Sequence, residues 1–269
     1  MVEQVTLYRA PTTEADAHAV ADWLADRVDA TVSVRTRFLS VYDDADLADD
    51  SPVGDSPVGD SLAEAFAKTR VLSPYEQETG NTMVGIVRYE ERALEHPERA
   101  GGVIYDGLQV QSILRRLLPE DERGLDHLHV PLLDRVVGTW GDHDGRWHKR
   151  VNVLGQPGLV SVPGLYEAPA KPEQYYKAQQ KHALLSGDSP PREVLENEVE
   201  GEFLVESDPR TTDALKGYVL QAVHYLETGE DFCEDETCRL ANPHRQPGVI
   251  QAQLRDPEFC PEHAEIYRP

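Results

Sequence analysis

The segment Gly229–Cys238, GEDFCEDETC, and the segment Cys260–His263, CPEH, decide how we expect the end of this chain to fold. All three cysteines of the 269 residues lie here, an odd number that does not suit a disulfide framework. Two short chelating pairs, separated by 21 residues, let a tail order itself around one ion. Soft thiolates and an imidazole favour zinc, so the pattern predicts one tetrahedral site of Cys233, Cys238, Cys260 and His263.

A zinc ion with four protein ligands has no open coordination position, so we expect it to be structural and unable to activate water. His244 is an alternative to His263 as the fourth ligand. Three reduced, buried cysteines without a metal are the competing interpretation. In the zinc interpretation, residues 229–269 form a zinc-binding C-terminal subdomain of a single domain that spans 1–269.

The composition is strongly acidic, with 49 acidic residues against 26 basic ones and a formal charge of −23. Only six of the basic residues are lysines, a pattern typical of proteins that stay hydrated in molar salt, where charges are screened over about 3 Å. We therefore expect a haloarchaeal, halophilic protein, with an ordinary acidic cytosolic protein as the alternative. Such a surface repels phosphate backbones, so nucleic acid is not an expected partner.

The first residues, Met1–Tyr8, show no basic region followed by an apolar one, and no window approaches 18 uninterrupted apolar residues. We expect no membrane partner. Cysteines gathered for a metal rather than dispersed for disulfides favour a reducing cytoplasm.

Periodicity indicates an α/β fold. We expect strands at 5–8, 30–41, 84–87, 103–105, 127–132, 150–154 and 159–162, and helices at 14–28, 61–70 and 109–118. Residues 43–60 carry seven aspartates and a direct repeat, which predicts an acidic, mobile insertion, and 167–200 suggests a short helix and an exposed loop. A long helix at about 209–228 follows, with Asp208 as N-cap, Pro209 at its first position and Gly229 as its stop.

The arrangement resembles the archaemetzincins, relatives of the metzincin metallopeptidases, whose signature runs HExxHxxGx3Cx4CxMx17CxxC. Here Gly229-x3-Cys233-x4-Cys238-x-Leu240 keeps that spacing, and 19 residues then lead to Cys260-x2-His263. The family's Met is Leu240, and its last Cys is His263. Residues 103–118 resemble the strand and helix that precede the family's central β-strand. Residues 159–165 resemble the strand that precedes its active-site helix. The resemblance implies a metzincin-like mixed sheet with packed helices, an active-site-type helix at about 209–228, and a zinc-bound tail.

The catalytic half of the signature does not match. Counted back from Gly229, the five positions of HExxH hold Ala222, Val223, His224, Tyr225 and Leu226. Shifting the register by two residues in either direction still leaves one His and no Glu, and the family's third ligand is Phe232 here. A peptidase zinc needs two imidazoles one helical turn apart, a third ligand and a carboxylate base.

Other histidines offer a non-standard second metal site. His224 is expected on the face of its helix opposite Leu215, Val219, Ala222 and Leu226, where a ligand facing a cleft would lie. Two of His127, His129, His143 and His148 would join it, with Glu167 as general base. The simpler interpretation is that these are ordinary histidines, solvent-facing or hydrogen-bonded.

Three functions follow. The favoured one is a zinc-stabilised, catalytically silent metzincin-like protein that binds peptide or protein, because the cysteine tail is intact and HExxH is not. The second is an active metallohydrolase that uses His224 and the other histidines. The third is a zinc-ribbon-like adaptor in a protein complex, with the N-terminal layer as scaffold. Substrate and oligomeric state are not legible in the sequence.

Overall fold

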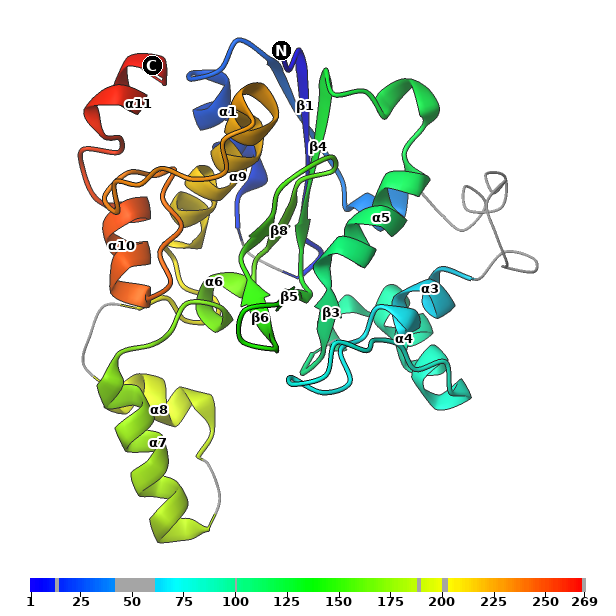
Figure 1. The fold of residues 1–269 in the computed structure, drawn as a ribbon, viewed down its shortest axis with the longest axis vertical. Coiled ribbons are helices and arrows are strands. Elements are labelled where there is room, and N and C mark those ends of the chain that lie inside the picture. The colour runs from blue at the N-terminus through cyan, green and yellow to red at the C-terminus, as the bar shows by residue number, and fades with distance from the viewer. Residues whose placement is uncertain (13–14, 42–60, 100, 188–189, 200–202, 268–269) are drawn as a thin grey trace.

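A computed structural model describes residues 1–12, 15–41, 61–99, 101–187, 190–199 and 203–267 (Figure 1). Its strands are β1 (Gln4–Tyr8), β2 (Thr31–Arg35), β3 (Ile104–Asp106), β4 (His127–Leu133), β5 (Val136–Gly141), β6 (Arg146–Arg150), β7 (Asn152–Val153) and β8 (Leu159–Ser161). Its helices are α1 (Ala17–Ala25), α2 (Phe38–Val41), α3 (Leu62–Lys68), α4 (Val84–Glu95), α5 (Gly107–Leu117), α6 (Gly164–Glu167), α7 (Glu173–Ser186), α8 (Arg192–Glu198), α9 (Thr211–Thr228), α10 (Gln246–Leu254) and α11 (Pro261–Ile266). The predicted insertion at 43–60 lies outside the described residues.

The fold is mixed α/β, as the sequence predicts, and is built on two sheets. The larger has the strand order β2-β1-β4-β8-β7, in which only the β7–β8 pair is antiparallel. The smaller has the order β3-β5-β6, parallel and then antiparallel. In the larger sheet, the chain passes from β1 to β2 on one side and later returns to β4 on the other. The order therefore reverses between β1 and β4.

Alternating residues of β1 and β4 divide the interior into two cores. Val5, Leu7, Leu128 and Val130 point to one face, where α1 and α9 pack. Tyr8 belongs to the core on the opposite face, which α5 covers. His127 and His129, which alternate with Leu128 and Val130, lie in register with Gln4 and Thr6, and their rings contact the hydroxyls of Thr6 and Tyr8 on that second face. The sheet thus separates these two histidines from α9.

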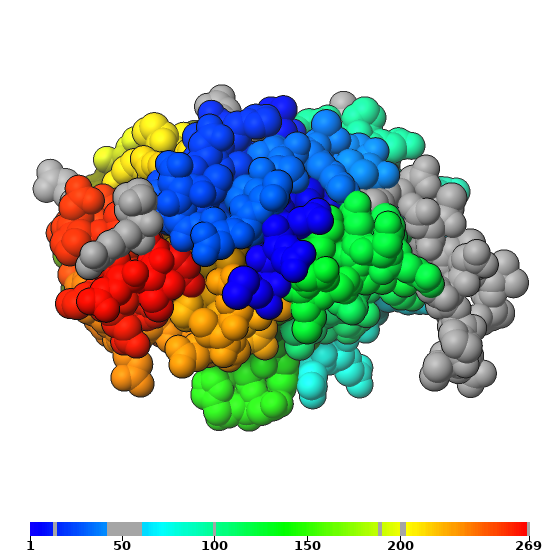
Figure 2. Space-filling model, turned by 90° about the horizontal axis from the view of Figure 1, so that it is seen from above, coloured from blue at the N-terminus to red at the C-terminus, as the bar shows by residue number. Residues whose placement is uncertain are grey.

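Helix α9 is enclosed on nearly all sides from Ala214 to His224, because the C-terminal segment folds back over it. Gln221 donates hydrogen bonds to the carbonyls of Arg239 and Ala241, at 3.0 and 2.8 Å. The same segment reaches the N-terminal part of the chain, where Arg27 pairs with Glu258 at 2.8 Å. In Figure 2, the red C-terminal residues lie against blue residues of the N-terminal part.

Four local predictions were wrong. The strand predicted at 30–41 ends at Arg35, and Phe38–Val41 form the helix α2. Residues 84–87, predicted as a strand from their valines and isoleucine, begin α4, because the helix-forming residues after them and the buried Glu90 and Ala93 set a helical face. The segment 167–200 holds two helices, α7 and α8, that project from the main body (Figure 1). Asp208 does not cap α9; the helix begins at Thr211, and Asp208 instead accepts hydrogen bonds from the backbone and guanidinium of Arg210.

No helix in the described part of the chain is long and apolar enough to cross a bilayer.

The contact between α9 and α10 generates a stability prediction. A Cβ added at Gly217 would lie 1.8 Å from Oε1 of the buried Gln253 and 3.1 Å from the Arg239 carbonyl oxygen. We expect Gly217→Ala to lower the free energy of unfolding by about 1–3 kcal/mol, because the helices must move apart. Gly85→Ala in α4 is the control, since nothing lies within 4 Å of its added Cβ, and the gain in helix propensity is up to about 1 kcal/mol. Urea unfolding of both variants measures this, and an equally stable Gly217→Ala protein would contradict it.

Candidate metal centre

Two turns and one helix position the residues of the C-terminal cluster. Gly229, with φ of 79°, ends α9 and redirects the chain, and Cys233 then donates its backbone N–H to the carbonyl of Leu240 at 3.0 Å. The loop so closed presents Cys233 and Cys238. Cys260 is the N-cap of α11, and Pro261 occupies the first turn of that helix. His263 lies one turn further along, so α11 presents both remaining side chains on one side.

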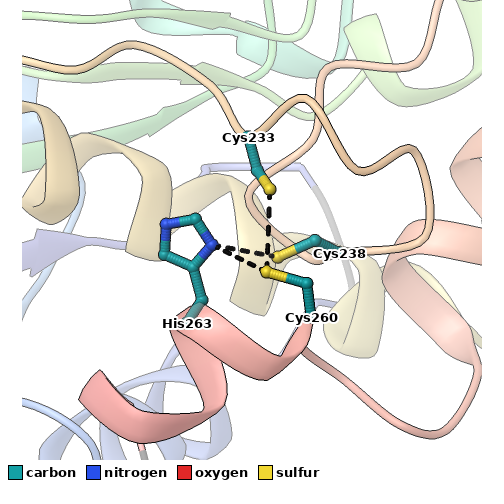
Figure 3. Close-up of side chains that lie close together, drawn as sticks. All are labelled: Cys233, Cys238, Cys260 and His263. Carbon is teal, nitrogen blue, oxygen red and sulfur yellow. Dashed lines mark hydrogen bonds between the residues drawn. The ribbon is translucent and has the colours of Figure 1, made fainter.

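The four side chains converge (Figure 3). The sulfurs of Cys233 and Cys260 lie 3.8 Å apart, and Nδ1 of His263 lies 3.7 Å from the sulfur of Cys238 and 3.1 Å from that of Cys260. In a tetrahedral zinc site with Zn–S bonds of about 2.3 Å, neighbouring sulfurs are about 3.8 Å apart. All three cysteines are free thiols rather than disulfides. The spacing therefore fits one tetrahedral ion.

The chemistry of these donors also fits a divalent cation. Burial raises the pKa of Cys233 to about 12, and burial raises the pKa of Cys238 as well. Thiolates in this environment need a compensating positive charge, and Zn²⁺ supplies it while displacing the thiol protons. With Cys233, Cys238, Cys260 and His263 as its four ligands, such an ion would have no open position for water or substrate. Such an ion would hold the tail in place.

The structure brings His263, rather than His244, into the cluster. His244 is exposed in the segment before α10, and it belongs to no group of converging metal-ligating side chains among the described residues. Its backbone carbonyl instead accepts a hydrogen bond from Ala170 at 2.9 Å.

His224 lines a hollow of about 790 Å³ next to the Cys₃His cluster, but little of its own surface is accessible. The residue is only 2% exposed; its Nδ1 lies 2.8 Å from the hydroxyl of Tyr267, and its ring packs edge-on against His263 at 5.2 Å between centroids. Burial lowers the pKa of His224, so the imidazole is neutral at pH 7. His224 thus borders a hollow, as expected, with its ring almost fully buried and hydrogen-bonded; its role as a metal ligand stays a prediction. Its Nε2 faces one exposed carboxylate, Glu230, at 4.0 Å, which does not make up a three-ligand set.

His127 and His129 lie across the sheet from His224 and are engaged in a buried polar network. Nε2 of His127 lies 2.9 Å from the Thr6 hydroxyl, and Nδ1 of His129 lies 2.8 Å from the Tyr8 hydroxyl. Nε2 of His129 is 3.0 Å from the carbonyl oxygen of Glu122. The Glu122 carboxylate completes a His₂Glu group, yet it is held by the Arg35 guanidinium through two hydrogen bonds of 2.9 Å. Three of the four ring nitrogens thus have hydrogen-bond partners, and the Arg35 guanidinium neutralises the Glu122 carboxylate. These contacts favour a hydrogen-bonded core over a metal site.

The remaining predicted residues lie elsewhere. His143 and His148 are in the β5–β6 hairpin, where they group with Asp144. Glu167 forms ion pairs with Lys149 at 2.6 Å and with Arg192 at 3.4 Å. Among the described residues, no group of converging metal ligands contains His224 or Glu167, so the unorthodox catalytic set is not assembled.

Sequence reasoning missed a cleft of about 460 Å³ at the carboxyl ends of the central strands. Thr12 follows β1, Asp134 and Arg135 follow β4, and Val162 follows β8, and all of them line it. In open α/β sheets, ligands bind outside the carboxyl ends of strands at the point where the strand order reverses, here between β1 and β4. The charged pair Asp134-Arg135 directly after an apolar strand is the signal in the sequence that could have indicated it.

The fold and the cluster define a mixed α/β protein with a C-terminal Cys₃His group. The chain belongs to a family of unknown function, DUF7001, whose model matches residues 6–266. No curated protein matches it. A crystal structure of archaemetzincin from Methanopyrus kandleri is similar to this chain with a TM-score of 0.44 and 11% sequence identity, covering 98% of this chain and 93% of that chain.

The cluster predicts a metal requirement. We expect one tightly held zinc per chain by elemental analysis after passage over a chelating resin, and a fall in Tm of roughly 10 °C or more on its removal, because metal binding contributes directly to folding. His263→Ala should lose the ion, whereas His244→Ala, the matched control, should keep it. If His263→Ala retained zinc and His244→Ala lost it, His244 would be the fourth ligand instead. If neither the variants nor the parent protein contained zinc, the prediction of a zinc centre would be refuted.

The buried histidines predict a loss of stability in acid. Burial, and next the charge of His127, lowers the pKa of His129 to about 4. In the unfolded state, His129 takes up a proton near pH 6.5. Its contribution to the free energy of unfolding is therefore fully present above that pH and falls by about 1.4 kcal/mol per pH unit between pH 6.5 and 4. We expect the free energy of unfolding, measured in urea between pH 7 and 5, to fall more steeply for the parent protein than for His129→Phe. His143→Ala, on the exposed hairpin, should keep the parent slope; identical slopes in all three would contradict the prediction.

Proposed function

We propose that this protein is a zinc-stabilised, metzincin-related binding protein without peptidase activity, which takes a basic peptide segment into the cleft at the carboxyl ends of β1, β4 and β8. The tie to the metzincins comes from the spacing of Gly229, Cys233, Cys238 and Cys260. The observation that carries the proposal is the combination of a closed Cys₃His cluster with a separate, open cleft.

The absence of peptidase activity is supported by what occupies the catalytic positions. The helix that would carry HExxH reads Ala222-Val223-His224-Tyr225-Leu226, which leaves out the glutamate base and the second imidazole. Its one histidine is bonded to Tyr267 and buried under the C-terminal segment. A hydrolytic zinc needs three ligands, an open position and a base, and none of these is supplied at α9.

The cleft has the size and composition of a binding site. Its volume falls in the range of about 300–1,000 Å³ that is usual for ligand sites. Thr211, the first residue of the 18-residue helix α9, lines the cleft, and the positive end of the helix dipole favours acceptors such as peptide carbonyls. Tyr166 adds an aromatic wall. The backbone carbonyls of a peptide provide such acceptors, and the aliphatic parts of its side chains can pack against Tyr166.

The charges of the cleft favour a basic group. Its two arginines are already paired, Arg135 with Glu90 at 2.8 Å and Arg192 with Glu167 at 3.4 Å. Asp134 is different, because its Oδ2 is buried and makes no hydrogen bond within the part of the chain that the structure describes. Burial raises the pKa of Asp134, and a cation beside it would stabilise the charged form. A lysine or arginine side chain of the peptide satisfies this carboxylate.

The proposal predicts selective binding that depends on Asp134. Pooled fluorescent decapeptides with a central Lys should bind at least about tenfold more tightly by anisotropy than matched pools with a central Gln, a difference of about 1.4 kcal/mol. Asp134→Asn should abolish this preference because it removes the charge without changing the shape. Glu91→Gln, which removes an exposed carboxylate on α4, is the control and should leave the preference unchanged.

Mass spectrometry of the same peptides after incubation tests the other half of the proposal. We expect the peptides to stay intact. Cleavage that stops on zinc removal and in His224→Ala would show an active metallopeptidase instead, and equal binding of the two pools would refute the cleft as a site for basic peptides.

A further inference from the structure

The β5–β6 hairpin carries a second group of metal-ligating side chains that the proposed function does not use. Strand β5 ends at Gly141 and β6 begins at Arg146, and the turn between them closes through a hydrogen bond of 2.8 Å from the N–H of Gly145 to the carbonyl of Gly141. His143 and Asp144 lie in this turn and His148 on β6. The group belongs to a different sheet from β1 and β4 and shares no residue with the Cys₃His cluster.

Two imidazole nitrogens face one carboxylate oxygen in this group. Nε2 of His148 lies 2.9 Å from Oδ1 of Asp144, and Nε2 of His143 lies 3.8 Å from the same oxygen. The two rings are nearly parallel, at 13°, with centroids 5.8 Å apart. All three ligand atoms lie within 4.8 Å of one another. Ligands of one first-row metal ion, at bonds of about 2.0–2.2 Å, lie roughly 3 Å apart, so a small rotation of the exposed His143 completes the set.

Gly141 keeps the inner side of this group open. A Cβ at this position would lie 2.6 Å from Oδ1 of Asp144 and 2.8 Å from Nε2 of His148, closer than side-chain atoms pack. The backbone of Gly141 is not in the left-handed region, so the turn itself does not demand glycine there. Because glycine has no Cβ, Asp144 Oδ1 and His148 Nε2 can lie close to the backbone of β5 at this position.

A simple hydrogen bond explains only part of this arrangement. The pair His148–Asp144 is a common contact, and it lowers the pKa of Asp144, with help from Arg146, whose Nε holds the other carboxylate oxygen at 2.7 Å. That pair does not account for the parallel placement of His143 on the same oxygen or for the space at Gly141. Because Arg146 holds one oxygen of the Asp144 carboxylate, the other oxygen, Oδ1, points toward both rings. Neighbouring side chains orient metal ligands in the same way.

We propose that the tip of the β5–β6 hairpin binds a divalent transition-metal ion through His143 Nε2, Asp144 Oδ1 and His148 Nε2, with water completing the coordination. Two imidazoles and one carboxylate are borderline ligands that suit Ni²⁺, Cu²⁺ or Zn²⁺ rather than Mg²⁺ or Ca²⁺. The site is open to solvent, since His143 is 79% exposed. Its ion is therefore exchangeable, in contrast to an ion enclosed by three thiolates and an imidazole.

Two tryptophans in the hairpin can report metal binding by their fluorescence. Trp140 and Trp147 are cross-strand partners, with ring centroids 5.9 Å apart, and they are two of the three tryptophans of the chain. Untagged, full-length protein with its zinc loaded is titrated with Ni²⁺, which quenches nearby indole fluorescence, and the stoichiometry is measured in parallel by calorimetry. We expect one Ni²⁺ per chain, quenching of the hairpin tryptophans, and no loss of zinc.

Substitutions then locate the ion. His143→Ala and His148→Ala should each weaken Ni²⁺ binding at least tenfold, and Gly141→Ala should do the same by filling the space. Asp142→Asn, which removes an acidic group from the same turn but not from the cluster, should bind as the parent does. Because His143 is exposed, its substitution leaves the fold intact even if Gly141→Ala fails to fold. Unchanged binding in both histidine variants, or Ni²⁺ uptake that displaces zinc one for one, would overturn the proposal.

Discussion

The convergence of three sulfurs and one imidazole at the C-terminal end links elements that are far apart along the chain. It joins a loop that follows α9 to the helix α11, which lies 22 residues further on from Cys238 to Cys260. That closure holds Tyr267 against His224 and Glu258 against Arg27. The C-terminal segment thereby covers α9 and contacts the N-terminal helix α1, so a local cluster fixes the position of elements from both ends of the chain.

The larger sheet decides which chemistry the protein can assemble. Its alternating side chains send apolar residues of β4 toward α9 and His127 and His129 toward the opposite core. The histidines available for a second metal are thus held in separate compartments. The cleft at its carboxyl edge is open and is lined by Asp134, whose Oδ2 has no hydrogen-bond partner among the described residues. The topology therefore places this cleft, His224 and the pair His127–His129 in three separate parts of the structure.

Patterns that act over a few residues predicted the fold well. Alternation placed His127 and His129 on one face of β4, and Gly229 ended α9 as expected. Cysteine spacing correctly predicted which four side chains would meet, although zinc binding itself stays a prediction, as does the halophilic origin. The failures have tertiary causes. Valines at 84–87 indicated a strand, but helical packing prevailed. The burial of His224 and the cleft beside Asp134 depend on segments distant in sequence, which periodicity does not reveal.

The order of these residues along the chain also sets the order in which contacts can form during synthesis. Helix α9 leaves the ribosome before Cys260 and His263 do, so its His224 face stays uncovered until those residues emerge. The N-terminal helix α1 likewise waits for Glu258. The core that α1 and α9 cover is therefore completed only after residues near 260 have been synthesised.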